Sequence, residues 1–131
     1  MKASVARLDH IQIAAPAGCE TAAREFYGRL LGMQEIEKPE LLRARGGCWF
    51  RCDDQQIHIG VEQAFAPARK AHPAFAVADL EELRKTLVAH GIKVTDDANV
   101  PGTRRFYAED PWGNRLEFVA LRGFDSPHSG A

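Results

Sequence analysis

The sequence predicts an α+β fold built from two copies of a βαβββ unit. Two observations carry this prediction: similar strand-like segments at residues 8–14 and 71–77, and an amphipathic helix that ends at a glycine after each of them. A repeat of about sixty residues is too long for most solenoids. Because it occurs only twice, we expect two small sheets that pair to close one core.

The first unit is predicted over residues 6–62. It opens with an alternating strand at residues 8–14, and Pro16 and Gly18 then mark a loop. Apolar residues recur at helical spacing before a stop at Gly32: Ala22, Ala23, Phe26, Tyr27, Leu30 and Leu31. Further strands are expected at residues 33–37, 41–45, 48–52 and 56–61.

The second unit is predicted over residues 71–122 and repeats this order. Asp79 and Glu82 form a capping box at the start of a helix that ends at Gly91. The apolar stripe of that helix is Leu80, Leu83, Leu87 and Val88. The remaining strands are expected at residues 93–95, 104–108 and 115–121.

Two further segments complete a single domain over residues 1–131. Residues 63–70, rich in Ala and containing Pro67, suit a linker between the units. Residues 123–131 are expected to form a flexible tail.

Composition excludes several classes of partner. The 131 residues carry 17 Lys and Arg against 18 Asp and Glu, a formal charge of −1, so no overall field attracts nucleic acid or an anionic membrane. No apolar stretch of about 20 residues and no signal peptide is visible, which makes a cytoplasmic location the default expectation. The 3 cysteines include no C-x-x-C pair and are expected to be reduced thiols.

Four side chains are candidates for a metal site. His10 and His72 occupy equivalent positions in the predicted first strands of the two units, and His58 and Glu117 occupy equivalent positions in the last strands. Three imidazoles and a carboxylate suit a divalent transition metal. Independent structural histidines have no reason to recur at matching positions, so the repeat favours a shared role.

A structural interpretation of the same residues stays open. Each histidine would then be a hydrogen-bonded, half-buried side chain, and Glu117 would pair with Arg105 or Arg115. Arg51, Arg104 and Arg105 flank the same strands, where they would clamp an anionic group or remain solvated.

Three segments carry a family resemblance. They are Leu8-Asp9-His10-Ile11, Phe26-Tyr27-Gly28-Arg29-Leu30-Leu31-Gly32-Met33 and Phe106-Tyr107-Ala108-Glu109-Asp110-Pro111-Trp112-Gly113-Asn114-Arg115-Leu116-Glu117. Over residues 6–122 the chain resembles the vicinal oxygen chelate superfamily, which includes glyoxalase I, fosfomycin and bleomycin resistance proteins, and extradiol dioxygenases. The resemblance implies two βαβββ modules paired into a U-shaped open barrel around a divalent metal.

The resemblance also implies roles for individual residues. His10, His72 and Glu117 match the family's metal ligands, and the metal would be iron, manganese, nickel or zinc. His58 matches the fourth position, where glyoxalase I usually has Glu or Gln, and would be a ligand or the general base. Tyr107 matches the tyrosine of extradiol dioxygenases that hydrogen-bonds the substrate.

The expected function is therefore that of a metal-dependent enzyme of the lyase, isomerase or ring-cleaving dioxygenase type. Its small substrate would bind the metal through adjacent oxygens. The alternative is a metal-free protein that binds or sequesters a small molecule, as bleomycin resistance proteins do. A homodimer is expected in either case.

Overall fold

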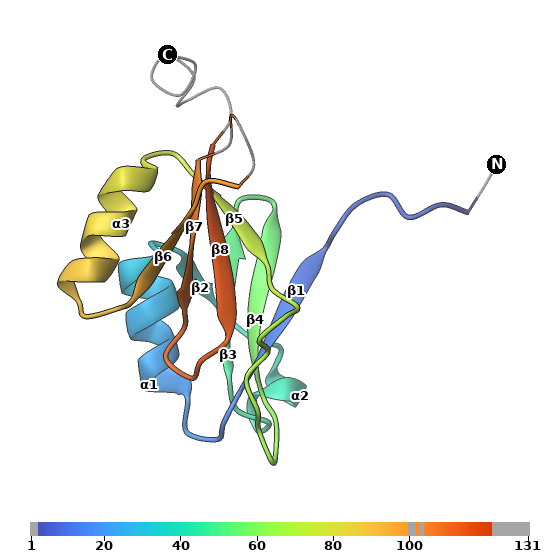
Figure 1. The fold of residues 1–131 in the computed structure, drawn as a ribbon. Helices are drawn as coiled ribbons and strands as arrows, with labels where there is room; N and C mark the ends of the chain where they lie inside the picture. Colours follow the sequence, from blue (N-terminus) through green and yellow to red (C-terminus); the bar gives the residue numbers. More distant parts are fainter. Residues whose placement is uncertain (1–2, 100–101, 103, 122–131) are drawn as a thin grey trace. The chain divides into compact units, whose positions relative to one another are not determined.

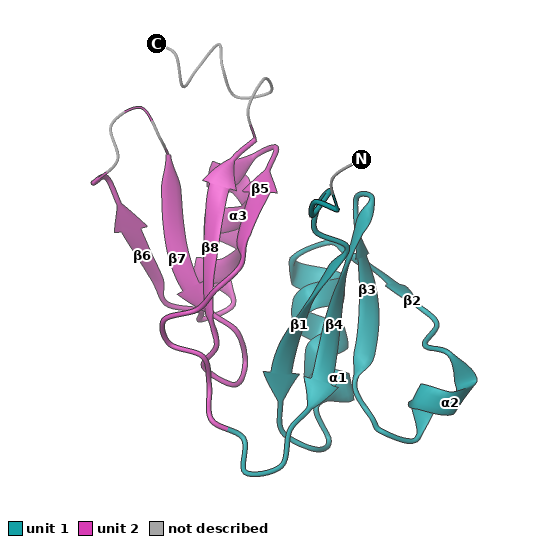
Figure 2. Ribbon diagram, turned by 90° about the vertical axis from the view of Figure 1, so that its right-hand side faces the viewer, with its two compact units in different colours: residues 1–65 teal, residues 66–131 magenta. Residues whose placement is uncertain are grey.

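The computed structural model describes residues 3–99, 102 and 104–121. The chain divides into two compact units, residues 1–65 and 66–131 (Figure 2). The division falls within the segment predicted as a linker, whereas the predicted tail lies outside the described residues.

The first unit is a four-stranded mixed sheet, and its helical segments follow β1 and β2 in the chain (Figure 1). The strand order is β1-β4-β3-β2, in which β1 and β4 are parallel and the other pairs are antiparallel. The elements in chain order are β1 (His10–Ala15), α1 (Glu20–Ala23), the π-helical segment η1 (Arg24–Leu30), β2 (Gln34–Ile36), α2 (Glu40–Arg43), β3 (Cys48–Cys52) and β4 (Gln55–Val61).

The second unit repeats this topology. Its strand order is β5-β8-β7-β6, again with the first and last strands parallel and the other pairs antiparallel. Its elements are β5 (Ala74–Val77), α3 (Leu80–Ala89), β6 (Val94–Asp97), β7 (Arg105–Glu109) and β8 (Arg115–Ala120). The predicted α+β class and the duplicated βαβββ order are thus confirmed.

One face of each sheet is apolar and packs against its own helix. In the first unit Phe50 and Tyr27 are fully buried, with ring centroids 6.1 Å apart, which joins β3 to η1. In the second unit Leu87 of α3 is fully buried. Phe106 and Phe118 of the neighbouring strands are each only 1% exposed. Each such side chain contributes roughly 1.5–3 kcal/mol by leaving water. Strand alternation leaves the polar side chains on the opposite face.

The helix boundaries follow the predicted signals. The Asp79 carboxylate accepts a hydrogen bond from the Glu82 backbone N–H at 3.1 Å, which caps α3. Gly32 and Gly91 have φ values of +79° and +77°, the left-handed conformation that ends a helix.

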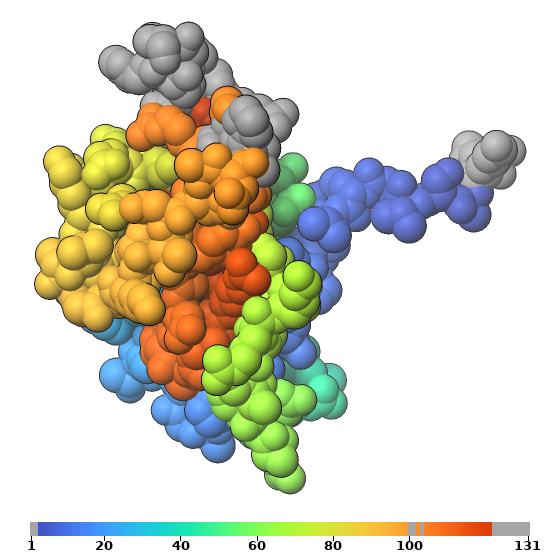
Figure 3. Space-filling view, in the orientation of Figure 1, coloured from blue at the N-terminus to red at the C-terminus, as the bar shows by residue number. Residues whose placement is uncertain are grey.

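Three expectations about the elements are wrong. Residues 41–45 are not a strand, because Glu40, Leu41, Leu42 and Arg43 are good helix formers and follow Pro39, which starts α2. His72 precedes β5 rather than lying in it. Val88 is 51% exposed, so the buried stripe of α3 is narrower than predicted, and most of that helix lies at the surface (Figure 3).

Among the described residues, no helix is long and apolar enough to cross a membrane.

The burial of the cysteines predicts how readily each thiol reacts. Cys19, Cys48 and Cys52 are all free, and Cys19 and Cys48 are buried. Burial raises the pKa of Cys48 to about 11 and also raises the pKa of Cys19 and Cys52. We therefore expect little alkylation of Cys48 and Cys19 by iodoacetamide at pH 7.5, slow alkylation of half-buried Cys52, and full alkylation in urea. Peptide mass mapping measures each site, and rapid native labelling of Cys48 would contradict this account.

Candidate functional site

In the first unit, His10 and His58 lie next to each other on the polar face of the sheet. His10 begins β1, and His58 lies in β4 opposite Gln12. The two imidazole rings are stacked, with centroids 4.3 Å apart and an interplanar angle of 20°. The pairing of β1 with β4 thus brings together two imidazole rings that lie 48 residues apart in the sequence.

The sheet register gives the same placement in the second unit. Ala74 of β5 pairs with Glu117 of β8, as Gln12 pairs with His58. His72 precedes Ala74 by two residues, just as His10 precedes Gln12. His10 is therefore equivalent to His72, and His58 to Glu117.

His72 and Glu117 make the closest contact in the candidate site. His72 Nε2 lies 2.9 Å from Glu117 Oε1, and His72 Nδ1 lies 2.8 Å from the backbone carbonyl oxygen of Lys70. Because a carbonyl only accepts, the network assigns the proton of a neutral ring to Nδ1. Nε2 then presents a lone pair to a carboxylate oxygen, which also accepts. Both atoms are satisfied by a metal ion that binds the two of them, or by a second ring proton that makes His72 an imidazolium paired with Glu117.

The other histidines also have one ring nitrogen held by an acceptor. His10 Nδ1 lies 2.9 Å from Asp9 Oδ2, and His58 Nε2 lies 2.8 Å from Gln56 Oε1. These contacts assign the remaining nitrogens, Nε2 of His10 and Nδ1 of His58, as the acceptors of neutral rings. Metal-bound histidines are commonly oriented in this way.

His58 is buried between two rings. Its imidazole stacks on the indole of Trp49, with centroids 3.7 Å apart and an interplanar angle of 1°, and also contacts His10. Burial first, and then the neighbouring His10, lower the pKa of His58 below its usual value of 6.5. His58 is therefore neutral at pH 7, the form that binds a metal or accepts a proton.

Glu117 is a buried carboxylate with a cationic partner. It is 7% exposed, and its Oε2 accepts a hydrogen bond from Arg105 Nη1 at 3.2 Å. Arg105 also donates to Asp97 at 3.0 Å through Nη2. Of the two partners that sequence left open for Glu117, the structure selects Arg105, which compensates the buried negative charge.

Tyr107 lies beside this pair. It is the register partner of Glu117, and its ring and that of His72 are T-shaped to each other with centroids 5.6 Å apart. The guanidinium carbon of Arg115 lies 4.2 Å from the centre of the Tyr107 ring, a cation–π contact. Arg115 is thus engaged with Tyr107 rather than with Glu117.

Comparison with known proteins identifies the family. The family model of the Glyoxalase/Bleomycin resistance protein/Dioxygenase superfamily matches residues 7–118. The chain belongs to this superfamily. The resemblance read from the three sequence segments is thereby confirmed.

Solved structures of the superfamily share the fold. A glyoxalase family protein from Bacillus anthracis is 53% identical, with a TM-score of 0.88 over 93% of this chain and 100% of that one. A glyoxalase/dioxygenase from Nostoc punctiforme is 21% identical, with a TM-score of 0.72 over 92% and 98%. The fosfomycin resistance protein FosX from Listeria monocytogenes is 21% identical, with a TM-score of 0.67 over 89% and 92%. The comparison with curated proteins gave no match.

Superfamily membership bears on the metal only in general terms. Superfamily proteins bind small molecules, often form dimers and often use divalent metals. Within the part of this chain that the structure describes, no single group of three or more His, Cys, Asp and Glu side chains is arranged to hold a metal. The four predicted donors form two pairs, one in each unit. Their role as metal ligands stays a prediction.

Sequence reasoning missed the groups that orient the histidines. Asp9 and Gln56 lie one and two residues from the rings they contact, so their proximity in sequence was an available signal. The Lys70 carbonyl gave no such signal, since every residue has a carbonyl. Sequence reasoning also did not pair Trp49 with His58, although the two are register partners.

Proposed function

We propose that the chain is a divalent-metal-dependent enzyme that binds a small substrate through two adjacent oxygen atoms. The proposed ligands are His10, His58, His72 and Glu117. The observation that carries the proposal is the contact of His72 Nε2 with Glu117 Oε1 at 2.9 Å, which puts two atoms able to bind a metal side by side. The equivalent placement of His10 and His58 supplies the further donors.

These donors fit a transition metal, because imidazole and carboxylate ligands suit zinc, iron, nickel and manganese. The bound metal would polarise substrate oxygens and lower the pKa of a bound water toward about 7. Arg105 would hold the Glu117 carboxylate in place through its contact with Oε2. His58 would be the fourth ligand or the general base, and the Tyr107 hydroxyl would hydrogen-bond the substrate.

Metal analysis tests this proposal. Wild-type protein reconstituted separately with Fe²⁺, Mn²⁺, Ni²⁺ and Zn²⁺ is expected to retain about one equivalent of the preferred ion per chain. His72→Ala and Glu117→Gln are expected to weaken retention by more than about 100-fold, beyond the loss of about 10- to 100-fold that is typical of orienting residues. His90→Ala is the matched control, since His90 is exposed and its Nδ1 also lies 2.8 Å from a backbone carbonyl oxygen, that of Thr86.

Circular dichroism on the same samples separates lost binding from lost folding. Wild-type protein that takes up no metal, or folded ligand variants that keep full occupancy, would reject the proposal. Iron would direct the substrate screen to catechols and ring-cleaving oxygenation. Nickel or zinc would direct it to hemithioacetals and epimerisable acyl compounds.

A metal-free small-molecule binding protein is the second candidate. Both carboxylate oxygens of Glu117 have protein partners, His72 and Arg105, and the ring stack of Trp49 and His58 offers an aromatic surface. Both features support capture of a ligand without an ion. Absence of metal from every reconstituted sample would favour this candidate. For either function we propose a cytoplasmic homodimer.

A further inference from the structure

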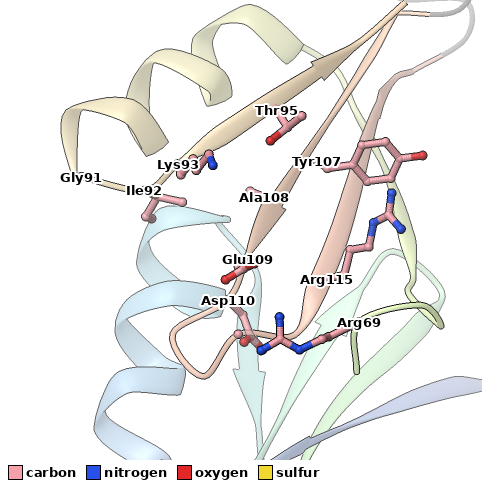
Figure 4. Close-up of a pocket in the computed structure, with 11 residues that line it drawn as sticks. Arg69, Gly91, Ile92, Lys93, Thr95, Tyr107, Ala108, Glu109, Asp110 and Arg115 are labelled. Carbon is pink, nitrogen blue, oxygen red and sulfur yellow. The ribbon is translucent and has the colours of Figure 1, made fainter. Parts of the chain in front are cut away.

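A cavity of about 520 Å³ lies in the second unit and shares Tyr107 and Arg115 with the candidate site (Figure 4). Its lining includes Lys93 and Thr95 from the β6 side, Tyr107 from β7, Arg115 from β8 and Arg69 from the segment before β5. Tyr107 and Glu117 are register partners, and Arg115 lies two residues before Glu117 in β8. Strand alternation therefore puts the cavity on the sheet face that carries Glu117.

The cavity has an excess of available positive charge. Arg69, Lys93 and Arg115 line it, and none of the three makes an ion pair within the described residues. Its two carboxylates are Glu109 and Asp110.

One of those carboxylates is already occupied. Asp110 is 5% exposed and accepts hydrogen bonds from the backbone N–H groups of Trp112 and Asn114 and from Asn114 Nδ2, at 2.8–3.0 Å. Exposed Glu109 is therefore the carboxylate that could pair with a cation of the lining, and three cations against two carboxylates leave one net positive charge.

Arg115 is positioned to receive an anion. Its guanidinium reaches toward the Tyr107 ring, with 4.2 Å between the guanidinium carbon and the ring centre (Figure 4). Stacking of this kind fixes the guanidinium plane and leaves the in-plane N–H groups for a bidentate oxyanion. Tyr107 is the register partner of Glu117, so an oxyanion on Arg115 would lie on the same sheet face as Glu117.

We propose that this cavity is an oxyanion subsite that binds the carboxylate or phosphate group of a small organic acid. Arg115 is the central contact, and Arg69 and Lys93 supply additional positive charge. That the bound acid is the enzyme's substrate rests on the proposed function.

Anion titration of the metal-free protein tests the subsite. ¹⁵N-labelled full-length chain is titrated separately with inorganic phosphate and with acetate at constant ionic strength, and backbone amide shifts are followed by NMR. Saturable shifts are expected at Gly91, Tyr107 and Gly113, which line the cavity. Arg115→Gln is expected to weaken the apparent affinity about tenfold or more, and Arg69→Gln by a smaller factor.

Arg84→Gln is the matched control, because Arg84 lies on α3 and is paired with Asp96 at 2.8 Å. It is expected to leave the anion affinity unchanged. Saturation by phosphate alone would identify a phosphate-bearing acid, and saturation by acetate a carboxylic acid. Shifts that do not saturate, or equal losses in Arg115→Gln and Arg84→Gln, would overturn the inference. Exposed Arg69 keeps the test valid if Arg115→Gln fails to fold.

The outcome is distinguishable from that of the metal experiment. Anion binding without metal uptake would reject the proposed metal-dependent enzyme and support the oxyanion subsite. Metal uptake without anion binding would reject the subsite and support the proposed enzyme.

Discussion

Replacement of Gly47 by alanine is expected to destabilise the protein by about 4 kcal/mol, the range in which backbone strain combines with a clash. Gly47 has a φ of +83°, which alanine adopts only at a cost of roughly 1–2 kcal/mol. An added Cβ would also lie 2.0 Å from the Ile59 carbonyl oxygen. That oxygen belongs to β4 beside β3, so relief of the clash requires separation of paired strands.

Urea unfolding followed by circular dichroism measures this effect, and Gly32→Ala is the matched control. Gly32 has a similar φ of +79°, but nothing lies within 4 Å of its added Cβ. The control should lose only about 1–2 kcal/mol, the cost of the backbone conformation. Equal losses in the two variants would show that the Ile59 carbonyl moves away freely.

Replacement of Asp110 by alanine is expected to lower the free energy of unfolding by about 3–5 kcal/mol. The buried carboxylate accepts three hydrogen bonds, and its removal leaves three donors without it. One of these donors is the Asn114 side chain, whose Oδ1 accepts from the Ala68 N–H at 2.9 Å. The loss therefore extends from the β7–β8 turn to the segment before β5.

Thermal unfolding of Asp110→Ala beside Glu109→Ala checks this prediction. Glu109 is the exposed neighbour, and its replacement should change stability by no more than about 0.5 kcal/mol. Asp110→Asn should recover part of the loss, because an amide oxygen still accepts. If Asp110→Ala were as stable as Glu109→Ala, the turn would not depend on this carboxylate.

Much of the fold followed from local patterns. Alternation located β3 and β4, and the capping box at Asp79 located α3, because these signals involve neighbouring residues. The strand predicted at residues 41–45 was wrong because a short apolar run does not distinguish a strand from a helical turn. The predicted burial of Val88 was wrong because the width of the buried stripe on a helix depends on what packs against that helix.

The candidate site was predictable only in part. The internal repeat was enough to match His10 with His72, and the register agrees with that match. Side-chain contacts were not predictable in the same way. The choice of Arg105 over Arg115 as partner of Glu117 depends on the Tyr107 ring that holds Arg115, a contact between strands. Arg69 also lines the cavity, and this was not predictable because it depends on the course of the segment before β5.

The parallel pairing of the first and last strands has a consequence for folding. His72 and Glu117 are 45 residues apart, so their contact forms only after the intervening helix and three strands have been placed. Contacts of such long sequence separation close late and slow the folding of a domain. A nascent or truncated chain that ends before β8 would carry His72 without its carboxylate, and β5 would lack the strand beside which it lies. Neither donor pair therefore exists until its unit is complete.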